Sequence, residues 1–148
     1  MSYYFDRDDV SLPGLCKHFK TRSDSEYNKA HGLMKYQTKR GGRLVLHSVG
    51  CPSKQEWGEA LQTLQTSLDL KKQVNQEVLE LHALTCERKD SDATHFIDDH
   101  LLMFHVEGIK ELAHMITTLR RATTTTSTAT GAAGDDQLGL YVFDKELL

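Results

Sequence analysis

Three long segments whose apolar residues recur at helical spacing constrain the fold of this chain more than any other feature. They run from about Pro13 to Arg40, from about Lys54 to Glu87 and from about Ser91 to Arg121. In each segment an apolar residue returns every three or four positions, which is the pattern of a helix with one buried face. Strand patterns are few, so the sequence predicts an all-α bundle with one long crossover connection.

Turn signals delimit these predicted helices. Gly41 and Gly42 follow the first one, as residues that end a helix do. The next ten residues, 43–52, are too many for a tight helix connection and indicate an extended loop that crosses the surface. Ser53, with Glu56 three residues later, has the pattern of a capping box, so the second helix is predicted to begin there.

The two ends of the chain are less regular than its middle. Residues 1–12 combine a short aromatic stretch with a polar turn, and residues 122–137 form a low-complexity stretch rich in Thr. Thr and Gly disfavour helix, and such a stretch buries little apolar surface, so it is predicted to be a loop. Residues 138–148 have the pattern of a short amphipathic helix. We therefore predict a single domain over residues 1–148.

Composition argues against several classes of function. The net charge is −3, and no basic stripe of the kind that binds nucleic acid is visible. No apolar run approaches the roughly 20 residues that a membrane-spanning helix needs. No signal peptide is visible after Met1, and the three cysteines follow no metal-binding spacing, so they are interpreted as free thiols. These features predict a cytoplasmic protein without nucleic-acid or membrane partners.

Polar residues interrupt the apolar stripes at four places. Glu26 and Lys29 interrupt the first stripe, Lys71 the second and His105 the third. Helical bundles build di-iron sites from inward-pointing carboxylates and histidines on several helices. Two lysines at such a place would repel Fe²⁺. The pattern therefore indicates a metal-site scaffold whose ligands have been substituted.

Six segments stand in a fixed order along the chain: SYYFDRDDV, KRGGR, WGEAL, VNQEVLELH, GIKEL and YVFDKELL. Through these segments the chain resembles the heavy- and light-type ferritin subunits of animals over essentially its whole length. The resemblance implies a ferritin-like four-helix bundle with a long crossover and a short fifth helix, in a 24-subunit shell that stores iron as a ferric mineral. It also implies that Met1 lies inside the first long helix, most of which is missing, and that residues 1–12 are its remnant and the turn after it.

The same resemblance implies a degraded ferroxidase site, the di-iron site at which heavy-type subunits oxidise Fe²⁺. Glu26 matches the family's bridging glutamate, but Ser25 stands where a further glutamate is expected. Lys29 stands in place of a histidine ligand, Lys71 in place of a glutamate and His105 in place of a glutamine. We expect an ion pair of Glu26 with Lys29 or with Lys71 to occupy the place of the metal.

A second set of matching positions belongs to the family's threefold iron channel. These are His95 and Asp98, with His82 nearby, where the family has two carboxylates. Neutral histidine still binds divalent metal, so the resemblance implies that this set could guide iron. The alternative is a solvated helix start, which favours acidic residues without any ligand.

Together these observations predict an intracellular iron-storage subunit that binds Fe²⁺ and Fe³⁺ and has no ferroxidase activity of its own. Its expected partners are complete ferritin subunits in a mixed shell. Two alternatives are open at this point. One is an active ferroxidase, if an upstream helix exists. The other is a degenerate relative that binds no iron.

Overall fold

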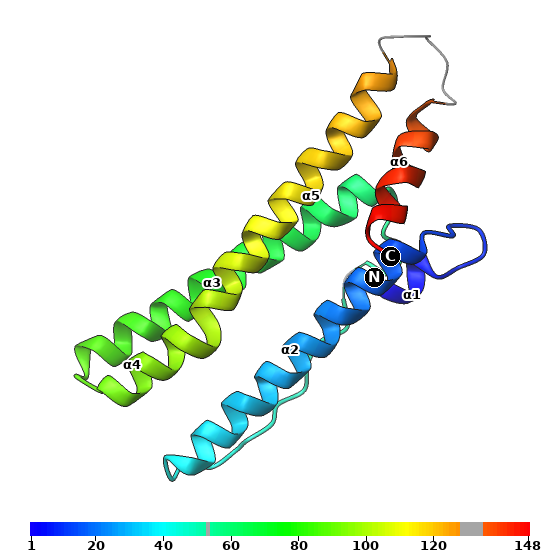
Figure 1. The fold of residues 1–148 in the computed structure, drawn as a ribbon. Coiled ribbons are helices and arrows are strands. Elements are labelled where there is room, and N and C mark those ends of the chain that lie inside the picture. Colours follow the sequence, from blue (N-terminus) through cyan, green and yellow to red (C-terminus); the bar gives the residue numbers. More distant parts are fainter. Residues whose placement is uncertain (53, 128–134) are drawn as a thin grey trace. The chain divides into compact units, whose positions relative to one another are not determined.

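The computed structural model describes residues 1–52, 54–127 and 135–148, without the side chains of 124–127, 135 and 136. Every regular element in those ranges is helical, which confirms the all-α prediction. Within them, no helix is both long and apolar enough to span a bilayer. The elements, labelled in Figure 1 where there is room, are α1 (Ser2–Phe5), α2 (Pro13–Lys39), α3 (Ala60–Glu87), α4 (Ser91–Ile97), the π-helical turn η1 (Asp98–Leu102), α5 (Met103–Ser127) and α6 (Asp135–Glu146).

The chain divides into two compact units, which are described separately. The first unit comprises Met1–Trp57 and Asp144–Leu148, and the second comprises Gly58–Phe143. In the first unit the short helix α1 packs on the start of α2. Phe5 and Leu15 are fully buried there, and the Phe5 and Phe19 rings stack with their centroids 5.6 Å apart.

Helix α2 begins with a cap supplied from the other end of the chain. Its N-cap residue, Leu12, has no side chain that can accept a hydrogen bond, and Pro13 has no N–H to offer. Instead, the buried carboxylate of Asp144 accepts the Gly14 N–H at 3.0 Å and the Leu15 N–H at 2.8 Å. A carboxylate is favourable at this position because the helix N-terminus carries partial positive charge. The cap therefore ties the end of the chain to the start of α2.

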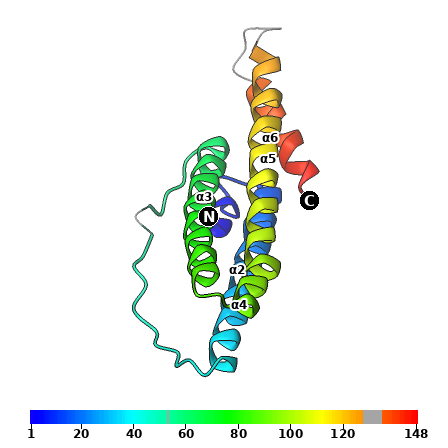
Figure 2. The ribbon, with the colours of Figure 1, turned by 90° about the vertical axis from the view of Figure 1, so that its left-hand side faces the viewer.

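The second unit is built on α3 and α5, which lie side by side in Figures 1 and 2. Val78 of α3, Ile97 of α4 and Leu101 of η1 form one buried apolar cluster. Asp90 begins α4, since its carboxylate accepts the Ala93 N–H at 3.1 Å. The predicted third helix, 91–121, is therefore present, with a π-helical turn inside it.

The start of α3 differs from the sequence prediction. Helix α3 begins at Ala60 instead of near Lys54, because Gly58 has a left-handed backbone, φ +70°, which a helix cannot include. The residue predicted as its cap, Ser53, lies outside the described residues, and the described crossover residues on either side of it, 43–52 and 54–59, form no helix (Figure 2).

Both ends of the stretch predicted as a loop, residues 122–137, are helical. Helix α5 continues to Ser127 and α6 already begins at Asp135, so the predicted terminal helix over 138–148 starts earlier and ends at Glu146. Within α5 the Thr123 hydroxyl donates to the backbone oxygen of Leu119 at 3.0 Å, so this polar group is satisfied inside the helix. Residues 128–134 of the predicted loop lie outside the described residues.

Candidate metal-binding positions

Glu26 and Lys29 form an ion pair on α2. Lys29 Nζ donates to Glu26 Oε1 at 2.9 Å, which confirms the first of the two pairings predicted for Glu26. The residues are three apart, so both lie on one face of the helix. The Glu26 side chain is 48% exposed, whereas that of Lys29 is only 12% exposed. A cation that approached this carboxylate would therefore meet a largely covered ammonium group beside it.

The remaining ferroxidase positions lie in both units. Ser25 is half-buried on α2, in the same unit as Glu26 and Lys29. Lys71 on α3 and His105 on α5 belong to the second unit. His105 is buried, with 3% of its surface exposed, and Lys71 is half-buried. His105 therefore occupies a buried position of its helix, whereas Lys71 is only partly covered.

The predicted channel residues form two histidine–carboxylate pairs in the second unit. His82 Nε2 lies 3.2 Å from Asp98 Oδ1, which joins α3 to η1. His95 Nε2 lies 3.3 Å from Asp99 Oδ2, one helical turn further along the same segment. The sequence placed His95 with Asp98, but neighbouring residues of a helix point in different directions, and each carboxylate meets a different imidazole.

Cys86 is a neighbour of this group that the sequence analysis did not single out. Its Sγ lies 3.8 Å from His82 Nδ1 and 4.0 Å from the Thr94 hydroxyl oxygen. The signal for it was present in the sequence, because His82 and Cys86 are four residues apart on a predicted helix and must share a face. Among the described residues, no three His, Cys, Asp or Glu side chains are grouped so that they could hold a metal ion together.

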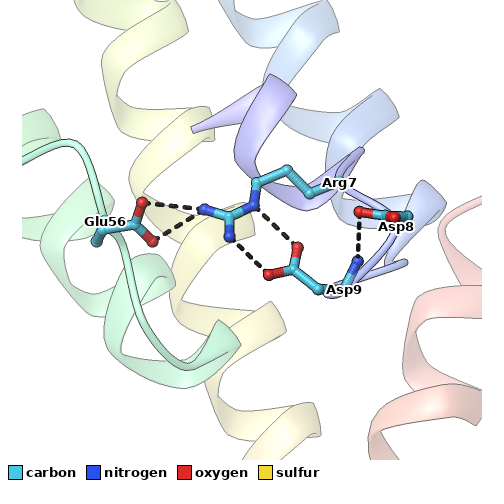
Figure 3. Close-up of polar contacts among 4 residues, drawn as sticks. All are labelled: Arg7, Asp8, Asp9 and Glu56. Carbon is cyan, nitrogen blue, oxygen red and sulfur yellow. Dashed lines mark hydrogen bonds and ion pairs between the residues drawn. The ribbon is translucent and has the colours of Figure 1, made fainter.

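Arg7 binds two carboxylates of the first unit, those of Asp9 and Glu56. Figure 3 shows the Arg7 guanidinium between two carboxylates. Its Nη1 donates to both oxygens of Glu56 at 3.0 Å, while Nε and Nη2 donate to Asp9 at 2.9 and 2.6 Å. The hydrogen bond and charge of Arg7 lower the pKa of Asp9, and the two carboxylates raise the pKa of Arg7. Glu56, predicted in a capping box, thus links the crossover to the N-terminal turn.

Comparison with known proteins assigns the family. A ferritin-like domain is matched over residues 1–122, which is most of the chain. The chain belongs to the ferritin family. It is 45% identical to the soma ferritin of Lymnaea stagnalis over 148 residues, which are 100% of this chain and 78% of that protein.

Two further ferritins are nearly as similar. A ferritin of Pacifastacus leniusculus is 44% identical over 147 residues, covering 99% of this chain and 75% of that protein. The middle subunit of ferritin from Salmo salar is 38% identical over 148 residues, covering 100% of this chain and 79% of that protein. The resemblance predicted from short sequence segments is therefore confirmed along the whole chain, and so is the ferritin-like helical fold.

Proposed function

We propose that this ferritin chain is an iron-storage subunit that binds Fe²⁺ and Fe³⁺ but does not itself oxidise Fe²⁺. The Glu26–Lys29 ion pair is the observation that carries the proposal. Glu26 is the one carboxylate among the five positions matched to the ferroxidase site, and an ammonium group already donates to one of its oxygens. A paired iron site that reacts with O₂ needs several anionic oxygen ligands around each metal ion.

The charge at these positions supports the same conclusion. On α2 the positive charge of Lys29 offsets the negative charge of Glu26, so this pair carries no net negative charge that would attract a metal ion. A divalent cation bound to Glu26 would lie roughly 4 Å from the Lys29 ammonium. The repulsion is about 2 kcal/mol with the dielectric constant of water and about 8 kcal/mol with the value of 20 that suits a protein surface. Even the smaller figure weakens metal binding more than tenfold.

Storage without ferroxidation requires partners that oxidise the iron. We propose that the chain co-assembles with complete heavy-type ferritin subunits into a 24-subunit shell in the cytoplasm. The Salmo salar relative is named as one subunit of a ferritin, which fits such a mixture of chains. His82, His95 and Asp98 would then contribute to an entry path for iron, since carboxylate oxygens and neutral imidazole nitrogens both bind divalent cations.

The test is co-expression of this chain with a complete heavy-type subunit, followed by isolation of shell-sized particles. We expect both chains in the shell, and an initial rate of Fe²⁺ oxidation per shell that falls in proportion to the share of this chain. The chain alone should oxidise Fe²⁺ no faster than buffer. Oxidation above buffer would overturn the absence of ferroxidase activity, and absence of the chain from every shell would overturn the storage assignment.

Two matched variants test the ion-pair argument directly. Lys29→Gln removes the ammonium beside Glu26, whereas Lys35→Gln removes an exposed ammonium elsewhere on α2. Lys29→Gln should tighten Fe²⁺ binding, measured anaerobically by isothermal titration calorimetry, by at least about tenfold, because it removes the repulsion of about 2 kcal/mol or more. Equal affinities in the two variants would contradict the argument.

A further inference from the structure

The crossover that follows α2 is exposed and has no regular backbone structure over residues 43–52 (Figure 2). Every residue from 37 to 52 is exposed. Within the described part of the chain, residues 44–52 exchange no backbone–backbone hydrogen bond with another residue. An endoprotease must hold its substrate backbone extended, and a segment without such hydrogen bonds needs no local unfolding first. Exposed loops of this kind are the preferred places of proteolytic cleavage.

Arg43 gives this exposed stretch a residue that a protease can recognise. Trypsin-like endoproteases select a positively charged side chain before the bond they cleave, through an aspartate in their specificity pocket. Arg43 is exposed, and no ion pair with a described residue engages its guanidinium. Two glycines precede it, and Gly41 has a left-handed backbone, φ +81°, so the chain on this side adapts readily. We infer that the Arg43–Leu44 peptide bond is a cleavage site for a trypsin-like endoprotease, at which breakdown of the folded chain begins.

One side-chain hydrogen bond must break before cleavage. Gln37 Nε2 donates to the Arg43 backbone oxygen at 3.1 Å, and this is the carbonyl oxygen that a protease polarises. The bond is exposed, so water replaces it at little net cost in free energy. Hydrolysis then breaks the C–N bond between Arg43 and Leu44. The hydroxyl of one water molecule joins the Arg43 carbonyl carbon and its hydrogen joins the Leu44 nitrogen, which gives the fragments 1–43 and 44–148.

Arg40, the preceding basic residue, is held by the end of α2. Its N–H donates to the Tyr36 backbone oxygen at 3.0 Å, and its Nη1 donates to the Tyr36 hydroxyl oxygen at 2.7 Å. On the other side of the bond after Arg40, the Gly41 N–H donates to the Thr38 backbone oxygen at 3.0 Å. Cleavage after Arg40 therefore requires the last turn of α2 to unwind first.

The basic residues in the other described turns and loops are also held. The Arg7 guanidinium is occupied by two carboxylates, one of them that of Glu56 (Figure 3). This ion pair tethers the crossover two residues after Lys54. The N–H groups of Arg88 and Lys89 donate to backbone oxygens of α3, both at 3.0 Å. The remaining Lys and Arg residues lie in α2, α3, α5 and α6, where the helix must open before it is cut.

The experiment is limited digestion of the full folded chain by trypsin, which accepts Lys as well as Arg, with the products weighed by mass spectrometry. Fragments 1–43 and 44–148 should be the first products, although the chain offers 18 Lys and Arg residues. Arg43→Gln should slow the loss of intact chain at least about tenfold, because the other sites are held in helices, turns or ion pairs. Arg120→Gln is the matched control, since it removes an exposed arginine inside α5 and should change this rate by less than about twofold.

Leu44→Pro tests the bond itself, because it keeps Arg43 but places a proline ring on the nitrogen of the bond, which trypsin does not cleave. Proline suits a stretch without backbone hydrogen bonds, so the variant should remain folded, as helix content from circular dichroism will show. It should resist digestion as strongly as Arg43→Gln. A first cut after any other Lys or Arg would overturn the inference. So would equal digestion rates of the unmodified chain and either crossover variant.

Discussion

Replacing Asp144 by alanine should destabilise the chain, because the carboxylate satisfies the Gly14 and Leu15 N–H groups at the start of α2. Asp144 is 2% exposed, so water cannot readily take its place. An unsatisfied buried donor costs about 1–3 kcal/mol, and loss of a helix cap typically costs about 1 kcal/mol. For two donors we expect a loss of about 2–4 kcal/mol, which is a large part of the 5–15 kcal/mol that stabilises a typical domain.

Urea unfolding followed by helical circular dichroism measures this loss. Glu146→Gln is the matched control, since it removes a carboxylate from an exposed position of the same helix, α6, and should change the free energy of unfolding by less than about 0.5 kcal/mol. Asp144→Asn keeps one acceptor oxygen but turns an amide toward the other N–H, so it should lie between the two. An Asp144→Ala midpoint equal to that of Glu146→Gln would refute the reasoning.

Two further predictions concern α2 and are tested by the same unfolding measurement. Gly14→Ala should destabilise the folded chain by at least about 2 kcal/mol, because the new Cβ would lie 2.0 Å from the Asp144 backbone oxygen. Gly32→Ala has open space around its Cβ and should stabilise the chain by about 0.5–1 kcal/mol. A gain in stability from Gly14→Ala would contradict this packing. Burial, with a smaller effect of the Arg22 charge, lowers the pKa of His18 from 6.5 to about 4. In the unfolded chain His18 therefore binds a proton near pH 6.5, whereas in the folded chain it does so only near pH 4. The contribution of His18 to the free energy of unfolding is complete above pH 6.5 and is lost as the pH falls toward 4. A shift of one pKa unit corresponds to about 1.36 kcal/mol, and partial exposure of His18 reduces this value, so the loss of unfolding free energy should be about 1–3 kcal/mol. His18→Gln should not show this loss. An equal pH dependence of stability in both chains would disprove the role of His18.

The long helices could be predicted because a helix depends on residues that are close in sequence. The period of the apolar residues placed α2 within one residue of its observed end, since Pro13–Lys39 compares with a predicted 13–40. The boundaries that moved depended on backbone conformation. Gly58 has a left-handed backbone, so α3 begins only after it. The Thr123 hydroxyl has an acceptor inside α5, and this helix continues into the Thr-rich stretch. Composition alone therefore misplaced the start of α3 and the end of α5.

In the candidate sites, too, contacts within one helix could be predicted from the sequence, whereas contacts between elements could not. The Glu26–Lys29 pair could be predicted because residues three apart on a helix are always neighbours, and the same rule would have linked His82 to Cys86. The Asp98 carboxylate reaches His82 only because η1 packs beside α3, and no local pattern states which histidine each acid will meet. The sequence by itself thus determined the family, the helices and the contacts within a helix turn. Only the tertiary structure decided that Asp144, far along the chain, caps α2, because packing brings together residues whose separation in sequence carries no distance information.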